Sequence, residues 1–105
     1  MPGLPGALFR MWFHSREEDA GGTMVYRPAE YEFPPARGRR GLEIKANGSF
    51  VLYEIAPTDG GLPVPGRWEA LGADVIRMRF DDRQRAPFVL HIVSCTKHML
   101  KVKRE

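Results

Sequence analysis

Residues 41–56 read GLEIKANGSFVLYEIA, and this stretch predicts a β-hairpin. In residues 42–45 apolar and charged side chains alternate, which is the period of a strand with one buried face. Asn47 and Gly48 both tolerate positive φ, so we expect a two-residue type I′ turn between the strands. Residues 49–56 have apolar side chains at both even and odd positions, which is typical of a strand that is covered on both faces.

Strand-like segments continue on both sides of this hairpin. Apolar and basic side chains alternate in residues 76–80 and again in residues 100–103, so each segment has one face toward a core. The expected strands are residues 9–16, 23–27, 41–46, 49–56, 67–71, 75–80, 88–95 and 98–104. No segment has a convincing helical period, and the best candidate for a short helical turn is residues 4–9, where Pro5 suits a first turn.

Short connections between these strands indicate an up-and-down meander. Residues 57–66 contain three prolines and three glycines, so we expect a loop that leaves no room for a continuing ladder. Residues 31–40 form a second long loop. We therefore expect an all-β fold, an antiparallel up-and-down meander of about eight short strands that forms a small closed or nearly closed barrel. A single domain covers residues 1–105.

The composition is that of a soluble globular domain. Of 105 residues, 43% are apolar and 28% are charged, and at this length a core forms without disulfides or metals. Cys95 is the single cysteine, which excludes an internal disulfide and favours a reducing, cytoplasmic location. The opening residues lack the basic start of a secretory signal, and no apolar run is long enough for a membrane helix. A net charge of +3 favours solubility and does not imply nucleic acid as a partner.

Three features resemble the lipocalin-like small barrels of the calycin group. Trp12 lies on the opening strand, residues 48–50 read Gly-Ser-Phe at the start of a central strand, and residues 66–68 read Gly-Arg-Trp at the start of the next. Together with the strand at residues 75–80, these segments form the order turn, strand, G-x-W strand and strand that recurs in such barrels. The resemblance covers most of the chain. The resemblance implies a small barrel that binds a ligand at one mouth.

The interior of such a barrel is either packed or hollow. Eight strands enclose a space just wide enough to be filled by side chains or to hold one small ligand. Most of the expected strands are short, so we favour a filled core over a ligand cavity. The side chains available to fill the space are those of Phe13, Phe50, Trp68, Met78, Phe80, Phe88 and Leu90.

The long loop at residues 31–40 contains aromatic residues that packing in a buried core does not readily explain. Tyr31 and Phe33 lie beside a diproline, so they form a lid over the barrel mouth, a partner-binding patch or a plug in one barrel end. Arg37, Arg39 and Arg40 lie among flexible glycines and could chelate phosphate or carboxylate. We favour the alternative of a solvated loop whose arginines pair with nearby acids.

Catalytic and metal-binding patterns are weak. His14 precedes a serine, but neighbouring residues of a strand point to opposite faces, so His14 does not activate that hydroxyl. His91 and Cys95 lie about 13 Å apart along an extended strand, and His98 can approach only Cys95, so we expect no zinc site. The acidic run at residues 17–19 lacks the oxygen spacing of a calcium loop, and phosphate-cradling motifs are absent. We expect no metal and no cofactor.

Two alternative functions need other features. A small-barrel enzyme would need His14 or His91 beside a carboxylate in a cleft. A nucleic-acid-binding barrel would use basic strand faces, but acidic residues are interspersed there, which argues against nucleic acid as a partner. The basic residues are Arg37, Arg39, Arg40, Arg77, Arg79, Lys97, Lys101, Lys103 and Arg104, with Tyr26, Tyr31 or Phe33 as stacking platforms.

The sequence favours a non-enzymatic binding module. We expect it to take a small hydrophobic or anionic ligand at the barrel mouth, or a protein partner through residues 26–40. The expected ligand-binding residues combine aromatic rings with one cation and are Trp12, Tyr26, Arg27, Tyr31, Phe33 and Trp68. The expected anion-binding residues are Arg37, Arg39 and Arg40.

Overall fold

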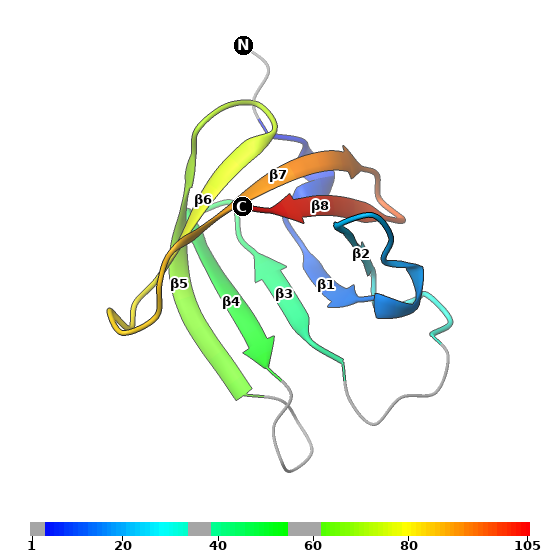
Figure 1. Cartoon of the computed structure of the whole chain (residues 1–105), viewed down its shortest axis with the longest axis horizontal. Helices are drawn as coiled ribbons and strands as arrows, with labels where there is room; N and C mark the ends of the chain where they lie inside the picture. The colour runs from blue at the N-terminus through cyan, green and yellow to red at the C-terminus, as the bar shows by residue number, and fades with distance from the viewer. Residues whose placement is uncertain (1–3, 34–38, 55–61) are drawn as a thin grey trace.

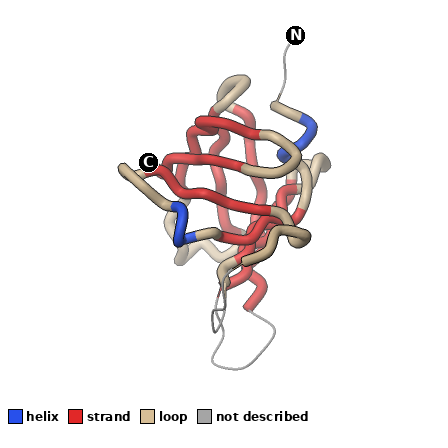
Figure 2. Tube along the Cα trace, turned by 90° about the vertical axis from the view of Figure 1, so that its right-hand side faces the viewer, coloured by secondary structure: helices blue, strands red, loops and turns tan. Residues whose placement is uncertain are grey.

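The computed structural model describes residues 4–33, 39–54 and 62–105, whose eight strands form one closed antiparallel barrel (Figure 1). The strands are β1 (Met11–His14), β2 (Thr23–Arg27), β3 (Gly41–Ile44), β4 (Ser49–Glu54), β5 (Leu62–Ala70), β6 (Val75–Phe80), β7 (Phe88–Cys95) and β8 (Leu100–Arg104). Two short 3₁₀ turns, η1 (Gly6–Leu8) and η2 (Arg16–Glu18), lie beside the strands (Figure 2). This confirms the all-β barrel and the early helical turn.

The order of strands around the barrel differs from the order along the chain at one place. Strands β3 to β8 follow one another, whereas β1 pairs with β3 and β2 pairs with β8. The chain between β2 and β3 therefore has to pass β1. Phe33 packs edge to face on Phe13, with 6.2 Å between the ring centroids. Since the neighbouring Trp12 is buried in the barrel interior, Phe13 faces outward, and the connection runs over the outer wall here.

One end of the barrel is tightly packed by inward-facing side chains at even-numbered positions. Trp12, Phe50, Ile76 and Met78 are 0% exposed. The indole Nε1 of Trp12 donates a hydrogen bond of 3.0 Å to the carbonyl oxygen of Leu8, so η1 closes this end. The filled core that the sequence predicts is present here.

The turn between β3 and β4 differs from the expected two-residue type. Gly48 has a φ of 94°, and every residue with positive φ in the described ranges is a glycine. Asn47 therefore does not have the positive φ that a type I′ turn requires. The N–H of Lys45 donates to the carbonyl oxygen of Ser49 at 2.9 Å. The Asn47 Oδ1 accepts from the N–H and hydroxyl of Ser49. These local side-chain bonds select a longer turn in which glycine is the left-handed residue.

Strand β5 begins at Leu62, inside the segment that we expected to be a loop. Pro63 and Pro65 pair with residues of β4, and pairing with β6 begins only at Gly66. The carbonyl oxygen of Pro65 accepts from the N–H of Asp81 at 3.1 Å, so the polar backbone groups of this proline face away from β4. For Pro63 and Pro65 the expectation that the prolines end the ladder was wrong, because their missing N–H groups lie on the side that β4 does not use. Residues 57–61 lie outside the described residues.

The connection between β7 and β8 is longer than the predicted one. Thr96 N–H donates to the carbonyl oxygen of Met99 at 2.8 Å, and the Thr96 Oγ1 accepts from two backbone N–H groups. Strand β8 therefore begins at Leu100 instead of His98. A shift in pairing register within β7 leaves Val93 54% exposed on the surface.

The η2 turn is held to the barrel by a carboxylate. Glu18 Oε2 accepts from Arg27 Nη2 at 2.6 Å, Oε1 accepts from Arg27 Nε at 2.9 Å, and the Ser15 hydroxyl donates to Oε1 at 2.8 Å. The hydrogen bond from Arg27 is the largest of the effects that lower the pKa of Glu18 to about 2. This bidentate ion pair holds the Arg27 side chain against η2 on the outer wall of the barrel.

We expect Glu18→Gln to lower the free energy of unfolding at pH 7 by about 1 to 2 kcal/mol, because a partly exposed ionic hydrogen bond is lost. The folded state holds the pKa of Glu18 below its unfolded value, so this stabilisation is present above about pH 4.5 and is lost as the pH falls through about 2. Urea unfolding at pH 7 and pH 3 should therefore show a smaller difference from wild type at pH 3. Glu69→Gln, whose carboxylate is 62% exposed and 3.7 Å from Arg77, is the matched control and should change little at either pH.

Candidate functional site

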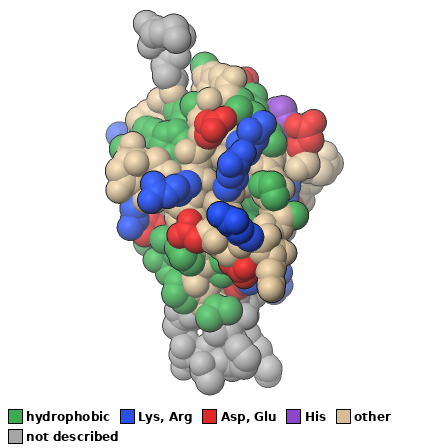
Figure 3. All heavy atoms as spheres, turned by 90° about the vertical axis from the view of Figure 1, so that its left-hand side faces the viewer, with side chains coloured by type: hydrophobic (Ala, Val, Ile, Leu, Met, Phe, Trp, Pro, Cys, Tyr) green, Lys and Arg blue, Asp and Glu red, His purple; other side chains and the backbone are tan. Residues whose placement is uncertain are grey.

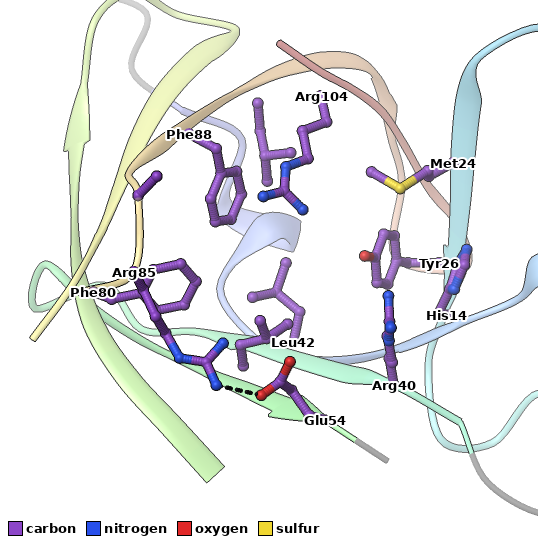
Figure 4. A pocket seen from close by; sticks show the side chains of 13 residues that line it. His14, Met24, Tyr26, Arg40, Leu42, Glu54, Phe80, Arg85, Phe88 and Arg104 are labelled. Atoms are coloured by element: carbon purple, nitrogen blue, oxygen red, sulfur yellow. Dashed lines mark hydrogen bonds and ion pairs between the residues drawn. The ribbon is translucent and has the colours of Figure 1, made fainter. Parts of the chain in front are cut away.

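The barrel is hollow at the end away from η1, where a cavity of about 310 Å³ opens to solvent (Figure 4). This volume lies at the lower end of the range for small-molecule sites. The apolar wall consists of Met24, Leu42, Leu52, Phe80, Ala86, Phe88 and Leu90. The polar residues are His14, Tyr26, Arg40, Glu54, Arg85 and Arg104. The interior is therefore filled at one end only.

Most polar residues of the mouth continue the inward-facing rows of the strands. Arg40 lies two residues before the inward-facing Leu42, and Glu54 lies two residues after Leu52. Since side chains alternate along a strand, a step of two keeps the same face. The residues placed in this way are His14, Arg40, Glu54 and Arg104.

Arg85 reaches the mouth from the connection between β6 and β7. Its Nη2 donates a hydrogen bond of 2.6 Å to Glu54 Oε1, and this bond is the main cause that holds the pKa of Glu54 below its usual value (Figure 4). The Arg85 Cζ also lies 5.6 Å from the centroid of the Phe80 ring. Glu54 and Arg85 thus compensate each other's charge.

Arg40 and Arg104 bring further positive charge to the mouth. In the described ranges, neither guanidinium forms an ion pair with a carboxylate. The Arg104 Cζ lies 4.2 Å from the centroid of the Phe88 ring, which orients this guanidinium along the cavity wall. Glu54 forms its ion pair with Arg85 and also interacts electrostatically with Arg40. With His14 counted as neutral, the three arginines and Glu54 give the lining residues a surplus of two positive charges. Asp19, which is bonded to His14, lies outside this lining.

Tyr26 directs its hydroxyl into the cavity between these two arginines (Figure 4). The residue is 8% exposed, and burial is the largest cause that raises the pKa of its phenol; Asp19 adds to the rise, while Arg40 and Arg104 oppose it. The phenol is therefore protonated at neutral pH and can donate a hydrogen bond. The described part of the chain supplies it with no side-chain partner.

His14 lies on the same wall and is held by an acid. Its Nε2 is 2.8 Å from Asp19 Oδ2, and Asp19 Oδ1 accepts from the N–H of Val25 at 2.8 Å. The imidazole ring lies 5.2 Å from the Tyr26 ring. A histidine beside a carboxylate at the cavity is the arrangement that the enzyme alternative requires.

The structure does not bring the six expected ligand-binding residues into one site. Of these six, Tyr26 is the one that lines the cavity. Trp12 belongs to the packed core near η1. Trp68 stacks on Phe9 at 5.6 Å, and its Nε1 donates to the carbonyl oxygen of Lys45 at 2.7 Å, so it lies on that side of the barrel as well. Both tryptophans shape the core rather than the mouth.

Arg27, Tyr31 and Phe33 lie together on the outer wall. The Arg27 Cζ is 4.6 Å from the Tyr31 ring centroid, and the Tyr31 and Phe33 centroids are 4.9 Å apart. None of the three lines the cavity. The aromatic residues of the loop therefore neither cover the mouth nor plug an end, because the chain has to pass outside β1. A role in binding a protein partner stays a prediction.

The three expected anion-binding arginines have different surroundings. Arg37 lies outside the described residues. Arg39 Nη2 is 2.8 Å from Glu17 Oε2, and the hydrogen bond from Arg39 is the largest cause that lowers the pKa of Glu17 to about 2. Arg39 thus pairs with an acid, as expected for a solvated loop, whereas Arg40 lines the cavity.

From the sequence we did not assign Glu54 or Arg85 to a binding site. Arg104 was named only for the nucleic-acid alternative, and His14 only as a catalytic base. The continued alternation of the strands is the signal that could have found Glu54, Arg104 and His14. Arg85 carries no such signal, since it comes from a connection whose path depends on the packed barrel.

Other chemically distinctive groups lie on the surface. His91 Nε2 is 2.7 Å from Glu105 Oε2, but the two side chains are 45% and 70% exposed. The described residues contain no group of three or more potential metal ligands. Over β5 and β6, basic side chains alternate with acidic and apolar ones (Figure 3), and Arg77 faces Glu69 across the two strands. This face lacks the continuous positive stripe that a nucleic-acid interface needs.

Comparison with protein-family models, with curated proteins and with solved structures finds no significant match to the chain. In the described ranges, no helix has the length and apolar composition needed to span a membrane. The cavity is therefore the feature from which we infer a function.

Proposed function

We propose that this protein is a lipocalin-like, non-enzymatic binding module that holds a small amphipathic anion in the cavity at the barrel mouth. The observation that carries the proposal is the combination of an apolar chamber with two guanidiniums, from Arg40 and Arg104, that no described carboxylate neutralises. Both residues are exposed at the mouth, where a ligand can reach the guanidiniums, and charge complementarity favours a ligand of opposite sign.

The two parts of the lining suit the two parts of such a ligand. Phe80, Phe88 and Leu90 present aromatic and aliphatic surface to an apolar body. At the mouth, Arg40 and Arg104 offer planar donors that match a carboxylate, sulfate or phosphate. The cavity volume of about 310 Å³ limits the body to a small ring system or a short chain.

A ligand panel tests the proposal by thermal shift and isothermal titration calorimetry. The panel contains octanoate, 2-naphthoate, 1-naphthyl sulfate and 1-naphthyl phosphate with the neutral octanol, 2-naphthamide and 1-naphthol. We expect at least one anion to bind at least about tenfold more tightly than its neutral counterpart, since a charge-assisted hydrogen bond is worth about 1.5 to 3 kcal/mol. At 100 times its Kd, that ligand should add about 2.7 kcal/mol of stability. If no anion binds better than its counterpart, the proposal is wrong.

Replacing both arginines locates the site. We expect the double variant Arg40→Gln, Arg104→Gln to bind the best anion at least about 30-fold more weakly, because two charge-assisted contacts are removed. Arg79→Gln removes the same charge from an exposed, outward-facing position on β6 and is the matched control. Equal affinity of the double variant and the control would place the binding elsewhere.

The hydrogen bond between His14 and Asp19 favours a second candidate function, general acid–base catalysis on a ligand in the same cavity. Hydrolysis of 1-naphthyl acetate, in which water cleaves the ester to naphthol and acetate, provides a fluorescent readout. Turnover that His14→Gln abolishes, while folding is retained, would support this candidate. An ester recovered unchanged would leave the binding module as the function.

A further inference from the structure

We propose that the cavity selects ligands whose head group carries two negative charges, of the phosphate-monoester type, over ligands with a singly charged head group. This inference rests on the proposed binding function and specifies its ligand class. The charges of the mouth carry it. Glu54 neutralises Arg85 through an ion pair of 2.6 Å, which leaves Arg40 and Arg104 without a carboxylate partner among the described residues. A carboxylate or sulfate would neutralise one of them, and a phosphate monoester both.

The placement of the two arginines suits a single head group. Arg40 directly precedes β3, Arg104 ends β8, and around the barrel β1 and β2 lie between these strands. Tyr26 on β2 therefore stands between the arginines, and its hydroxyl points into the cavity (Figure 4). Both arginines line the same cavity as this phenol.

The donors at this position match a phosphate chemically. A phosphate monoester has three terminal oxygens, and guanidiniums bind such oxygens through paired N–H donors. The Tyr26 hydroxyl is a neutral donor, so it can satisfy a third oxygen without adding charge. The apolar wall around Phe88 then receives the esterified group, which the small cavity limits to a soluble molecule with a body of one or two rings.

Glu54 limits the number of negative charges that the mouth accepts. With its carboxylate in place, Arg85 is already paired and does not contribute a free positive charge. Without that carboxylate, the lining would hold three uncompensated guanidiniums. Glu54→Gln should therefore increase the affinity for a doubly charged ligand, a gain that damage to the fold does not produce.

The test compares 1-naphthyl phosphate, 1-naphthyl sulfate and 1-naphthol, which share one apolar body and carry about two, one and no negative charges at pH 7.5. Calorimetry at constant ionic strength should show the phosphate binding at least about tenfold more tightly than the sulfate. At pH 5 the phosphate is mostly singly charged, because its second pKa is about 6, so its advantage over the sulfate should fall to about threefold or less. The ratio of the two affinities removes any change that is common to both anions.

Glu54→Gln should bind 1-naphthyl phosphate at least about threefold more tightly than wild type, and the exposed control Arg79→Gln should bind it unchanged. Equal affinities for the phosphate and the sulfate at pH 7.5 would overturn the selection for a double charge and leave the anion-binding function in place. Failure of every anion in the panel would overturn both. If Glu54→Gln does not fold, the comparison of the three naphthyl compounds on the wild-type protein still decides the question.

Discussion

Replacing Trp12 with alanine is expected to lower the free energy of unfolding by about 3 to 5 kcal/mol, the range for truncation of a large buried aromatic side chain. Trp12 is 0% exposed and belongs to the core together with Ile44, Phe50 and Leu100. Its indole also donates the hydrogen bond to the carbonyl oxygen of Leu8 that ties η1 across the barrel end. The alanine variant loses the packing, creates a cavity and removes one of the two hydrogen bonds that this carbonyl accepts, the other coming from the N–H of Arg10.

Trp12→Phe separates the two contributions. Phenylalanine keeps most of the buried ring but has no N–H donor, so we expect a loss of about 1 to 2 kcal/mol. Urea unfolding followed by circular dichroism measures both variants, with Trp68 as a remaining fluorescent reporter. A loss below about 1 kcal/mol for Trp12→Ala would show that Trp12 does not hold the packed end as described.

Gly66→Ala is expected to destabilise the barrel by about 3 kcal/mol, at the upper end of the costs of overpacking a core. A Cβ at this position would collide with the backbone carbonyl oxygen of Arg79 and would lie 2.6 Å from two ring atoms of Phe50. Gly66 pairs with Phe50 on β4 and with Phe80 on β6, so it lies where two aromatic side chains approach the strand. The carbonyl cannot move without disturbing the β5–β6 ladder, which makes relief of the collision costly.

Gly72→Ala is the matched control, because a Cβ there meets nothing within 4 Å and the residue has no positive φ. We expect it to change the free energy of unfolding by less than about 0.5 kcal/mol, or to raise it slightly by restricting the unfolded chain. Thermal and urea unfolding of the two variants side by side gives the comparison. Equal stabilities would contradict the close approach of Phe50 to Gly66.

Local patterns predicted the strands and turns well where neighbouring residues decide the structure. Alternating residues predicted β3, β6 and β8. Pro63 and Pro65 misled the prediction, because both pair with β4 while their missing N–H groups lie on the side of β5 that β4 does not use. The turn at Gly48 was placed correctly but assigned the wrong type, since the choice between turns depended on the bonds that Asn47 forms with Ser49.

The candidate site was less predictable than the fold. Aromatic residues of the long loop attracted attention in the sequence, yet Tyr31 and Phe33 lie on the outer wall. The mouth is instead lined by polar residues that continue the inward rows, such as Arg40 and Arg104. Such residues look like ordinary surface charges in a sequence, because alternation identifies a face of a strand without showing where along the strand the core ends.

The sequence by itself determined that this chain forms an antiparallel barrel, because alternation and turn residues act over neighbouring positions and need no knowledge of the partner strand. Only the tertiary structure decided that the β1–β2 hairpin is inserted between β3 and β8, which forces the following segment outside the wall. It also decided that Arg40, Arg104 and Tyr26 meet at one mouth. These residues are far apart in the chain, and closure of the barrel brings them together through strand pairing and register, which depend on the packing of the whole core.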